Sequence, residues 1–308
     1  MMVGNLEKVF YNQPNMKTFA DYKSEGPNWI TLATGEYYPD MLVEACLLYE
    51  PVLRMFGQLL ATSESSERLF TQIADLRESW MRIQLARVFR KYVSPETPVE
   101  MLKRKSQAAQ IIADFGKGFR PIHEVQAGFS SRPIPDEVMC ALLCEYKSRG
   151  KKGYDLTERF FGLFQTTLPE LVIEGPIRAG KDVLLGGVLP DYPNPKRPVD
   201  FVIYDGQKSR VLAIGLARYD SDRGGSQEDD RTGGYWNCAN EILTYAKVHG
   251  QSIRVIFVND GPGLLLGSMW NDYAALEAHW EDQVRIVTLR MVTERLTHDW
   301  LLGLASNG

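Results

Sequence analysis

Acidic side chains stand at the start of a strand-like run where a metal-dependent reaction could take place. Asp200 follows Pro198-Val199 and opens the run DFVIYD, and a second strand-like run, Val211 to Arg218, follows a turn at Asp205-Gly206. Carboxylates are the hard oxygen ligands that Mg²⁺ prefers. Such an ion polarises a phosphate and lowers the pKa of the attacking water. The residues therefore predict a site for phosphodiester hydrolysis at a sheet edge.

Residue types that contact DNA gather around these two runs. Arginine pairs bidentately with guanine or phosphate, and glutamine pairs with adenine. Two basic residues lie just before Asp200, where backbone phosphates would pass and be positioned without sequence reading. For each single residue, a solvated loop with salt bridges is the competing interpretation. The candidate DNA-binding residues are Arg218, Asp222, Arg223, Gln227, Asp229, Arg231, Lys196 and Arg197.

The composition limits the class of protein. The 308-residue chain has a formal net charge of −4, which argues against coating nucleic acid by bulk charge and leaves a specific DNA enzyme open. No apolar run approaches the roughly 20 residues of a membrane span, and the N-terminus lacks the pattern of a secretory signal. The four cysteines form no CxxC pair, and the four histidines are scattered singly. We therefore expect a reduced, cytoplasmic protein without a zinc site.

One stretch has the spacing of a phosphate-binding loop. GPIRAGKD, from Gly175 to Asp182, follows a strand-like run and matches the glycine and lysine positions of a P-loop. Its eighth position is Asp182, where a P-loop needs a Ser or Thr hydroxyl for magnesium. The following VLLGGVLP is a poor helix start, so no helix N-terminus would receive the phosphates. The sequence therefore predicts a β-turn between strands.

The elements that must position these residues change character near residue 150. Residues 1–150 form a mainly helical N-terminal region in this interpretation, although residues 1–38 show no strong period. Apolar residues recur at helical spacing over one long stretch, Ser63 to Val93. Residues 121–135 are rich in Pro, Gly and Ser and are expected to form a loop.

Residues 151–308 predict strands and helices in alternation. A helix capped by Asp155 comes first, followed by four strand-like runs, a helix from Trp236 to His249, a buried strand, a short helix, a last strand and a closing helix. This order predicts an α/β fold, with a mixed central β-sheet flanked by helices.

The order helix, three strands, helix, strand between Asp155 and Val258 resembles the αβββαβ core of the PD-(D/E)XK nucleases. The runs ARYDSDRGGSQEDDRTGGY and VNDGPGLLLGSMW resemble type II restriction endonucleases in that superfamily. The resemblance covers roughly the C-terminal half. It implies that Asp200 binds Mg²⁺ and that an acidic residue on the preceding helix assists, for which Glu158 is the match and Glu174 a second candidate. In that family a nearby lysine orients or deprotonates the attacking water.

The second strand departs from the family pattern. The E-x-K of the family falls at Gly215-Leu216-Ala217, which has neither carboxylate nor lysine. Alternation along the strand puts Gly215 and Ala217 on one face, and Leu216, Arg218 and Asp220 on the other. Three explanations stay open. The ligand has migrated to Glu228, Asp220 or Asp222, with Arg218 replacing the lysine; the sequence carries an inactivating substitution, which the glycine inside a strand favours; or the protein is a non-cleaving relative.

These observations predict a sequence-specific endonuclease that cuts double-stranded DNA with Mg²⁺, a type II restriction enzyme. A two-fold DNA site is read by a two-fold protein, so a homodimer is expected, with residues 1–150 serving dimerisation or clamping the duplex. The alternatives are a DNA-binding protein that does not cleave, a disabled nuclease, and an unrelated α/β enzyme in which Asp200 lies in a turn. The expected catalytic residues are Asp200, Glu158, Glu228 and Arg218, and the expected metal ligands are Asp200, Glu174 and Asp220.

Overall fold

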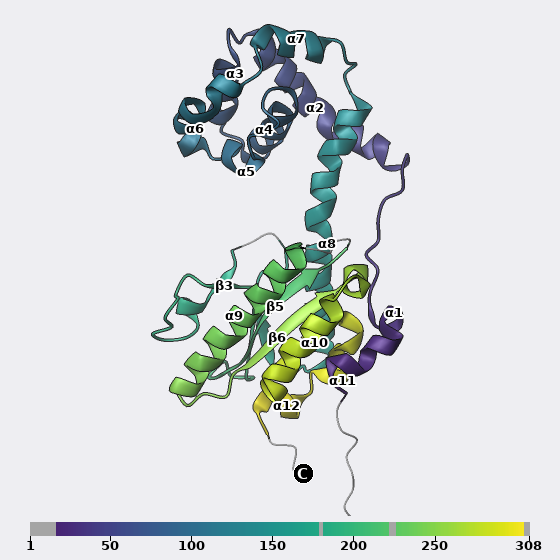
Figure 1. The fold of residues 1–308 in the computed structure, drawn as a ribbon, viewed down its shortest axis with the longest axis vertical. Helices are drawn as coiled ribbons and strands as arrows, with labels where there is room; N and C mark the ends of the chain where they lie inside the picture. The colour runs from purple at the N-terminus through teal and green to yellow at the C-terminus, as the bar shows by residue number, and fades with distance from the viewer. Residues whose placement is uncertain (1–16, 179–180, 222–225, 305–308) are drawn as a thin grey trace, which may run out of the picture. The chain divides into compact units, whose positions relative to one another are not determined.

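The computed structural model describes residues 17–178, 181–221 and 226–304. The chain divides into two compact units (Figure 1). One unit contains residues 34–150, and the other joins the residues up to Ala33 to those from Lys151 onward. The second boundary falls inside one long helix, α8 (Glu137–Thr167). The helical unit is therefore an insertion in the chain of the α/β unit.

The unit of residues 34–150 is built of helices around a core rich in aromatic rings. Ring centroids of Phe70 and Phe89 lie 5.2 Å apart, and those of Phe56 and Phe129 lie 5.3 Å apart. Burial of such large rings stabilises the packing of one helix on the next. Its elements are α2 (Met41–Ala61), α3 (Ser66–Asp75), α4 (Ser79–Tyr92), α5 (Val99–Leu102), η2 (Lys105–Gln107), α6 (Ala108–Phe115), η3 (Gly116–Gly118), α7 (Ile122–Ser130) and the beginning of α8.

Two expectations for this unit are wrong in detail. The single helix expected from Ser63 to Val93 is two helices, because the side chain of Glu78 accepts hydrogen bonds from the backbone N–H groups of Trp80 and Met81 and so begins α4 anew. The loop expected over residues 121–135 contains α7, which forms because Val125 and Phe129 are buried on one face of it.

The α/β unit is organised around a five-stranded mixed sheet with the order β1-β4-β5-β6-β7. The pairs β1–β4 and β4–β5 are antiparallel, whereas β5–β6 and β6–β7 are parallel. The structure confirms the α/β class. With the two strands of a separate sheet between β1 and β4 set aside, the order α8, β1, β4, β5, α9, β6 matches the expected αβββαβ sequence of elements. The strands are β1 (Val172–Glu174), β4 (Phe201–Tyr204), β5 (Val211–Tyr219), β6 (Arg254–Asp260) and β7 (Val284–Val287).

Helices and short elements complete the unit. The parallel strands are joined by α9 (Ser226–Val248) and α10 (Met269–His279). The strands β2 (Val183–Leu184) and β3 (Pro198–Val199) form a separate two-stranded sheet. Within the ranges that the structure describes, every helix is too short or too polar to cross a membrane. The remaining elements are η4 (Leu185–Gly187), η5 (Pro262–Leu265), η6 (Glu281–Gln283), η7 (Leu289–Met291), α11 (Val292–Arg295) and α12 (His298–Leu302).

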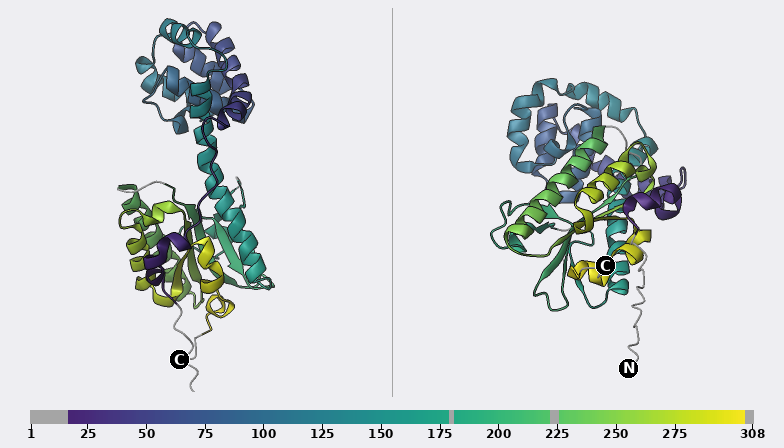
Figure 2. Two further views of the ribbon diagram at one scale, coloured as in Figure 1. Left: turned by 90° about the vertical axis from the view of Figure 1, so that its right-hand side faces the viewer. Right: turned by 60° about the horizontal axis from the view of Figure 1, so that its bottom comes forward.

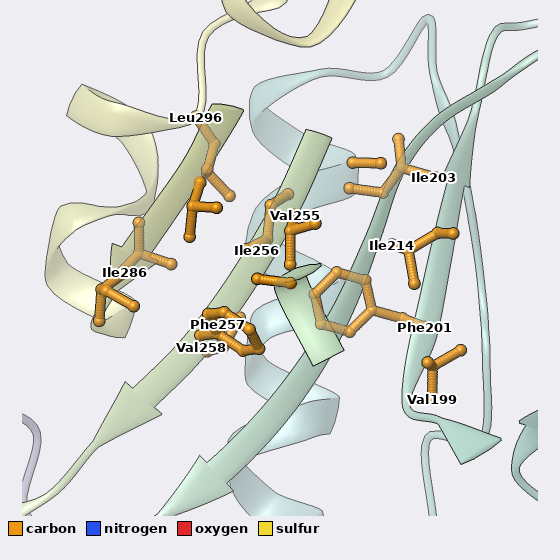
Figure 3. Close-up of a cluster of buried hydrophobic side chains, with 14 of the residues drawn as sticks. Val199, Phe201, Ile203, Ile214, Val255, Ile256, Phe257, Val258, Ile286 and Leu296 are labelled. Atoms are coloured by element: carbon orange, nitrogen blue, oxygen red, sulfur yellow. The ribbon is translucent and has the colours of Figure 1, made fainter. Parts of the chain in front are cut away.

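Two helices cover opposite faces of the sheet (Figure 2). On one face, the ring of Phe201 packs against Phe160 of α8 with a centroid distance of 4.9 Å. On the other face, Tyr235 of α9 stacks on Phe257 at 4.1 Å. Figure 3 shows Phe201, Phe257 and the aliphatic side chains that surround them. Burial on both faces explains why the central strands read as nearly continuous apolar runs.

The N-terminal segment belongs to the α/β unit and not to the helical region in which it was expected. It forms η1 (Phe19–Glu25) and α1 (Gly26–Trp29). The ring of Phe19 stacks on Trp270 at 4.5 Å, and its backbone N–H donates to Glu277 Oε1 over 2.7 Å. Residues 17–33 are therefore held by groups near residue 270. The chain passes between the two units twice, after Ala33 and after Gly150, and the expected boundary at residue 150 is the second of these.

Candidate functional site

Asp200 lies at an irregularity between β3 and β4. Its backbone N–H donates to the carbonyl of Gly215 (3.1 Å), and its side-chain Oδ2 accepts a hydrogen bond from the N–H of Ala217 (2.7 Å). Among the described residues, Ala217 is the donor to the Asp200 carboxylate. A carboxylate has about four acceptor positions, so Asp200 keeps capacity for further ligands.

Asp200 shares the α9 side of the sheet with Arg218. In the parallel pairing of β5 and β6, Leu216 stands beside Phe257 and Arg218 beside Asn259, and both β6 residues contact Tyr235 of α9. Arg218 favours the charged form of Asp200. The pKa of Tyr235 is raised by burial first, with the charges of Asp220 and Asp200 adding to the effect. These electrostatic contacts group Asp200, Arg218 and Asp220 near α9.

The structure gives a packing reason for glycine at position 215. A Cβ atom added there would lie 2.1 Å from Cζ of Phe201 and 2.6 Å from the carbonyl oxygen of Ile256. Position 215 faces the α8 layer, where no side chain fits. A carboxylate at 215 is therefore excluded by this packing, and the glycine needs no inactivating substitution to explain it. On the face of Asp200, the corresponding strand positions are Leu216 and Arg218.

Asp182 is a site residue that the sequence interpretation missed. The strands β2 and β3 pair antiparallel with Val183 opposite Val199 and Leu184 opposite Pro198. Continuing this register by one residue places Asp182 opposite Asp200. The charge of Asp182 raises the pKa of Asp200, as expected for two carboxylates at opposed positions. The pair could not be found from local sequence, because it depends on the pairing of β2 with β3.

The pKa of Asp200 is raised above the ordinary aspartate value. Burial is the largest cause, because it disfavours the charged form, and the charge of Asp182 adds to it. The N–H of Ala217 and the guanidinium of Arg218 act in the opposite direction. Two carboxylates that face each other repel, and a bound cation would remove that repulsion and lower the pKa again. This electrostatic pattern is typical of functional sites.

Asp220 is enclosed at the end of β5. Its side chain is 1% exposed, and its Oδ1 lies 3.8 Å from Nε of Arg218. Its carbonyl oxygen accepts the N–H of Gly263, and the close approach of Gly261 to the same oxygen would leave a Cβ only 2.3 Å away. Asp220 therefore lies against Arg218 and helps to orient its guanidinium.

Three of the other described candidates form ion pairs with residues other than Asp200. Glu158 binds Arg178 over 3.0 Å, and Glu174 pairs with Lys208. Arg197 lies 3.6 Å from Glu241 of α9 and is only partly exposed, while Lys196 is exposed. Exposed pairs of this kind contribute little to stability. The structure does not bring Glu158 or Glu174 together with Asp200.

Several expected DNA-binding residues fall where the structure is not described. Asp222 and Arg223 lie outside the described residues. The backbone of residues 227–231 belongs to the first turns of α9, which begins at Ser226, about ten residues before the helix start expected at Trp236. The side chains of Gln227, Glu228, Asp229 and Arg231 are likewise outside the description. Their expected roles stay predictions.

The acidic residues at Asp200 are too few to enclose a metal ion by themselves. Across the described part of the chain, no three or more His, Cys, Asp or Glu side chains form a group able to hold a metal. Magnesium is commonly bound through one or two carboxylates, with waters and substrate phosphates completing its octahedron. The opposed pair Asp182 and Asp200 fits this requirement. No protein-family model matches the chain, and no curated protein matches its sequence.

Proposed function

We propose that this protein is a Mg²⁺-dependent endonuclease that hydrolyses phosphodiester bonds in double-stranded DNA at specific sites, as type II restriction enzymes of the PD-(D/E)XK superfamily do. The observation that carries the proposal is the opposition of Asp182 and Asp200 beside Arg218, within an αβββαβ order of elements. Two opposed carboxylates near a guanidinium are suited to a substrate that carries negative phosphates.

The roles of the residues follow from their chemistry. Asp182 and Asp200 would hold the Mg²⁺, which when bound polarises the phosphate and acidifies a water molecule. Both carboxylates must be ionised to do so, and the charge of Arg218 favours the ionised form of Asp200. The side chain of Arg218 is 44% exposed and oriented by Asp220, so its guanidinium is accessible to a phosphate oxygen, which it binds through two N–H donors.

A DNA-binding protein that does not cleave is the second candidate. Leu216 lies on the face of Asp200 where a further carboxylate would complete the metal site, and it cannot bind an ion. A site with two carboxylates holds Mg²⁺ more weakly than one with three, so this observation favours binding without hydrolysis. The residues of α9 and the preceding stretch, with Lys196, would contact DNA in either case.

We also propose that the protein is a homodimer in the cytoplasm. A two-fold DNA site is matched by a two-fold protein. The helical unit of residues 34–150 would serve dimerisation or clamp the duplex, since its compact, separate core is not needed to build the Asp200 site.

Plasmid cleavage with Mg²⁺ tests the proposal. Discrete fragments are expected with the wild-type chain, and a loss of at least 100-fold in rate with Asp200→Asn, since removal of a metal-binding or charge-stabilising group typically has this effect. Asp114→Asn, an exposed position on α6, makes the same chemical change in the helical unit and should cleave normally. Equal cutting by Asp200→Asn and the wild type would show that the metal assignment is wrong.

Binding measured on the same plasmid separates the two candidates. Tight, site-specific binding that weakens with rising salt, without fragments at any Mg²⁺ concentration, would favour the non-cleaving protein. Absence of both binding and cleavage would contradict both candidates.

A further inference from the structure

A cavity lies on the α8 side of the sheet, and the described charged residues that line it are both arginines. It has a volume of about 460 Å³ and is lined by α8, by Thr31 after α1, and by two residues after β7. Those residues are Arg159 and Arg290, and the lining that the structure describes contains no Asp or Glu. The size falls in the range of 300–1,000 Å³, which is typical of small-molecule sites.

Neither guanidinium is neutralised within the part of the chain that the structure describes. Arg290 donates one N–H to the carbonyl of Asn28 (2.6 Å), which leaves its charge without a carboxylate partner. Arg159 is exposed, and its neighbour Glu158 is already paired with Arg178. Two unneutralised arginines on one concave surface produce a positive potential that attracts an anion.

The cavity walls are of mixed polarity, and part of them is held by buried hydrogen bonds. Thr31 and Leu289 are held in place because the backbone N–H of each donates to the buried carboxylate of Asp260, over 2.6 Å and 3.0 Å. Gly162 and Leu163 supply an apolar wall, and Thr166 lines the cavity beside them. The cavity stands where β6 and β7 end, and ligands of α/β sheets bind outside the carboxyl ends of the parallel strands.

We propose that this cavity binds a small organic phosphate of mononucleotide size. A phosphate monoester carries a charge of about −1.5 to −2 at neutral pH, which matches two guanidinium groups, and each guanidinium offers bidentate hydrogen bonds to phosphate oxygens. The apolar wall of Gly162 and Leu163 contacts the organic part of the ligand. This site is independent of the proposed DNA cleavage, since it lies on the α8 side of the sheet.

Titration calorimetry in chloride buffer with a nucleoside monophosphate, with inorganic phosphate and with the matching nucleoside tests the proposal. The monophosphate is expected to bind, and Arg159→Gln and Arg290→Gln should each weaken it at least tenfold. Arg54→Gln makes the same charge change at an exposed position of the helical unit and should leave affinity unchanged. Circular dichroism spectra matching the wild type would show that the exposed substitutions leave the fold intact.

Three outcomes would overturn the proposal. No binding of the monophosphate at millimolar concentration would show that the cavity is not a ligand site. Equal weakening by Arg54→Gln would assign the affinity to overall charge. Identical affinity for inorganic phosphate and the nucleoside monophosphate would reject the organic part of the ligand.

Discussion

Two aspartates on opposite faces of the same sheet show how the surroundings of a carboxylate separate a structural role from a chemical one. Asp260 and Asp200 each have a pKa raised mainly by burial. Asp260 accepts three backbone N–H groups, from Thr31 (2.6 Å), Gly261 (2.7 Å) and Leu289 (3.0 Å). From the described residues, Asp200 accepts one such bond, from Ala217, and it lies opposite Asp182.

The difference indicates what each side chain is for. The hydrogen bonds of Asp260 compensate its burial and tie three separate segments together, so its oxygens are committed to the fold. Asp200 is also partly buried, accepts fewer hydrogen bonds from the described residues, and has the like charge of Asp182 opposite. Residues held at a cost to stability concentrate at functional sites. The comparison therefore favours Asp200, and not Asp260, as the residue available to an ion.

The largest effect is expected from Asp260→Ala. It leaves three N–H groups without their acceptor, and buried unsatisfied donors each cost about 1–3 kcal/mol. We expect the free energy of unfolding to fall by about 3 kcal/mol or more, measured by urea denaturation followed by circular dichroism. A loss below about 1 kcal/mol would mean that Asp260 does not fasten the N-terminal segment and that the contrast with Asp200 fails.

Asp200→Asn is expected to act in the opposite direction at neutral pH. Because the folded-state pKa is raised, the stability that protonated Asp200 contributes is present at low pH and is lost as pH rises through that pKa. The amide keeps an acceptor for Ala217 and carries no charge. We expect a gain of roughly 0.5–2 kcal/mol in urea denaturation at pH 7.5.

The pH dependence sharpens this test. The advantage of Asp200→Asn should shrink as pH falls through the raised pKa of Asp200 toward 3.8, the ordinary aspartate value. An advantage that does not change between neutral and acidic pH would assign it to packing and remove the electrostatic argument for the site.

The smallest effect is expected from Mg²⁺ itself. A ligand that binds only the folded state stabilises it by about 0.8 kcal/mol at three times its dissociation constant. Thermal denaturation with increasing MgCl₂ should show this shift for the wild type and lose it in Asp182→Asn and Asp200→Asn. Persistence of the shift in both variants would place the ion elsewhere.

The sequence predicted the part of the molecule that depends on local pattern. The strand at Phe201, the strand at Val211 and the buried strand near Val255 were expected from short apolar runs bounded by Gly, Pro and Asp, and all three are present. The alternation of Leu216 and Arg218 against Gly215 was also expected, and the pairing with β6 agrees with it.

The missed features depend on contacts between distant residues. Asp182 gains its meaning from pairing of β2 with β3, which no local pattern in Gly175–Asp182 reveals. The need for glycine at 215 comes from the ring of Phe201 on the neighbouring strand. The early start of α9 was hidden by Gly233 and Gly234, which lower helix propensity, and by a polar stretch that resembles a loop.

The inserted position of the helical unit sets the order in which the protein can fold during synthesis. Thr31 is 229 residues from its acceptor Asp260, and Phe19 is 258 residues from Glu277. The helical unit, by contrast, is complete at residue 150. Domains fold as units while the chain emerges from the ribosome, so the helical unit forms first. Residues 17–33 are synthesised before their partners Asp260 and Glu277, so they cannot dock until those partners have been made. A chain truncated before β6 lacks both partners.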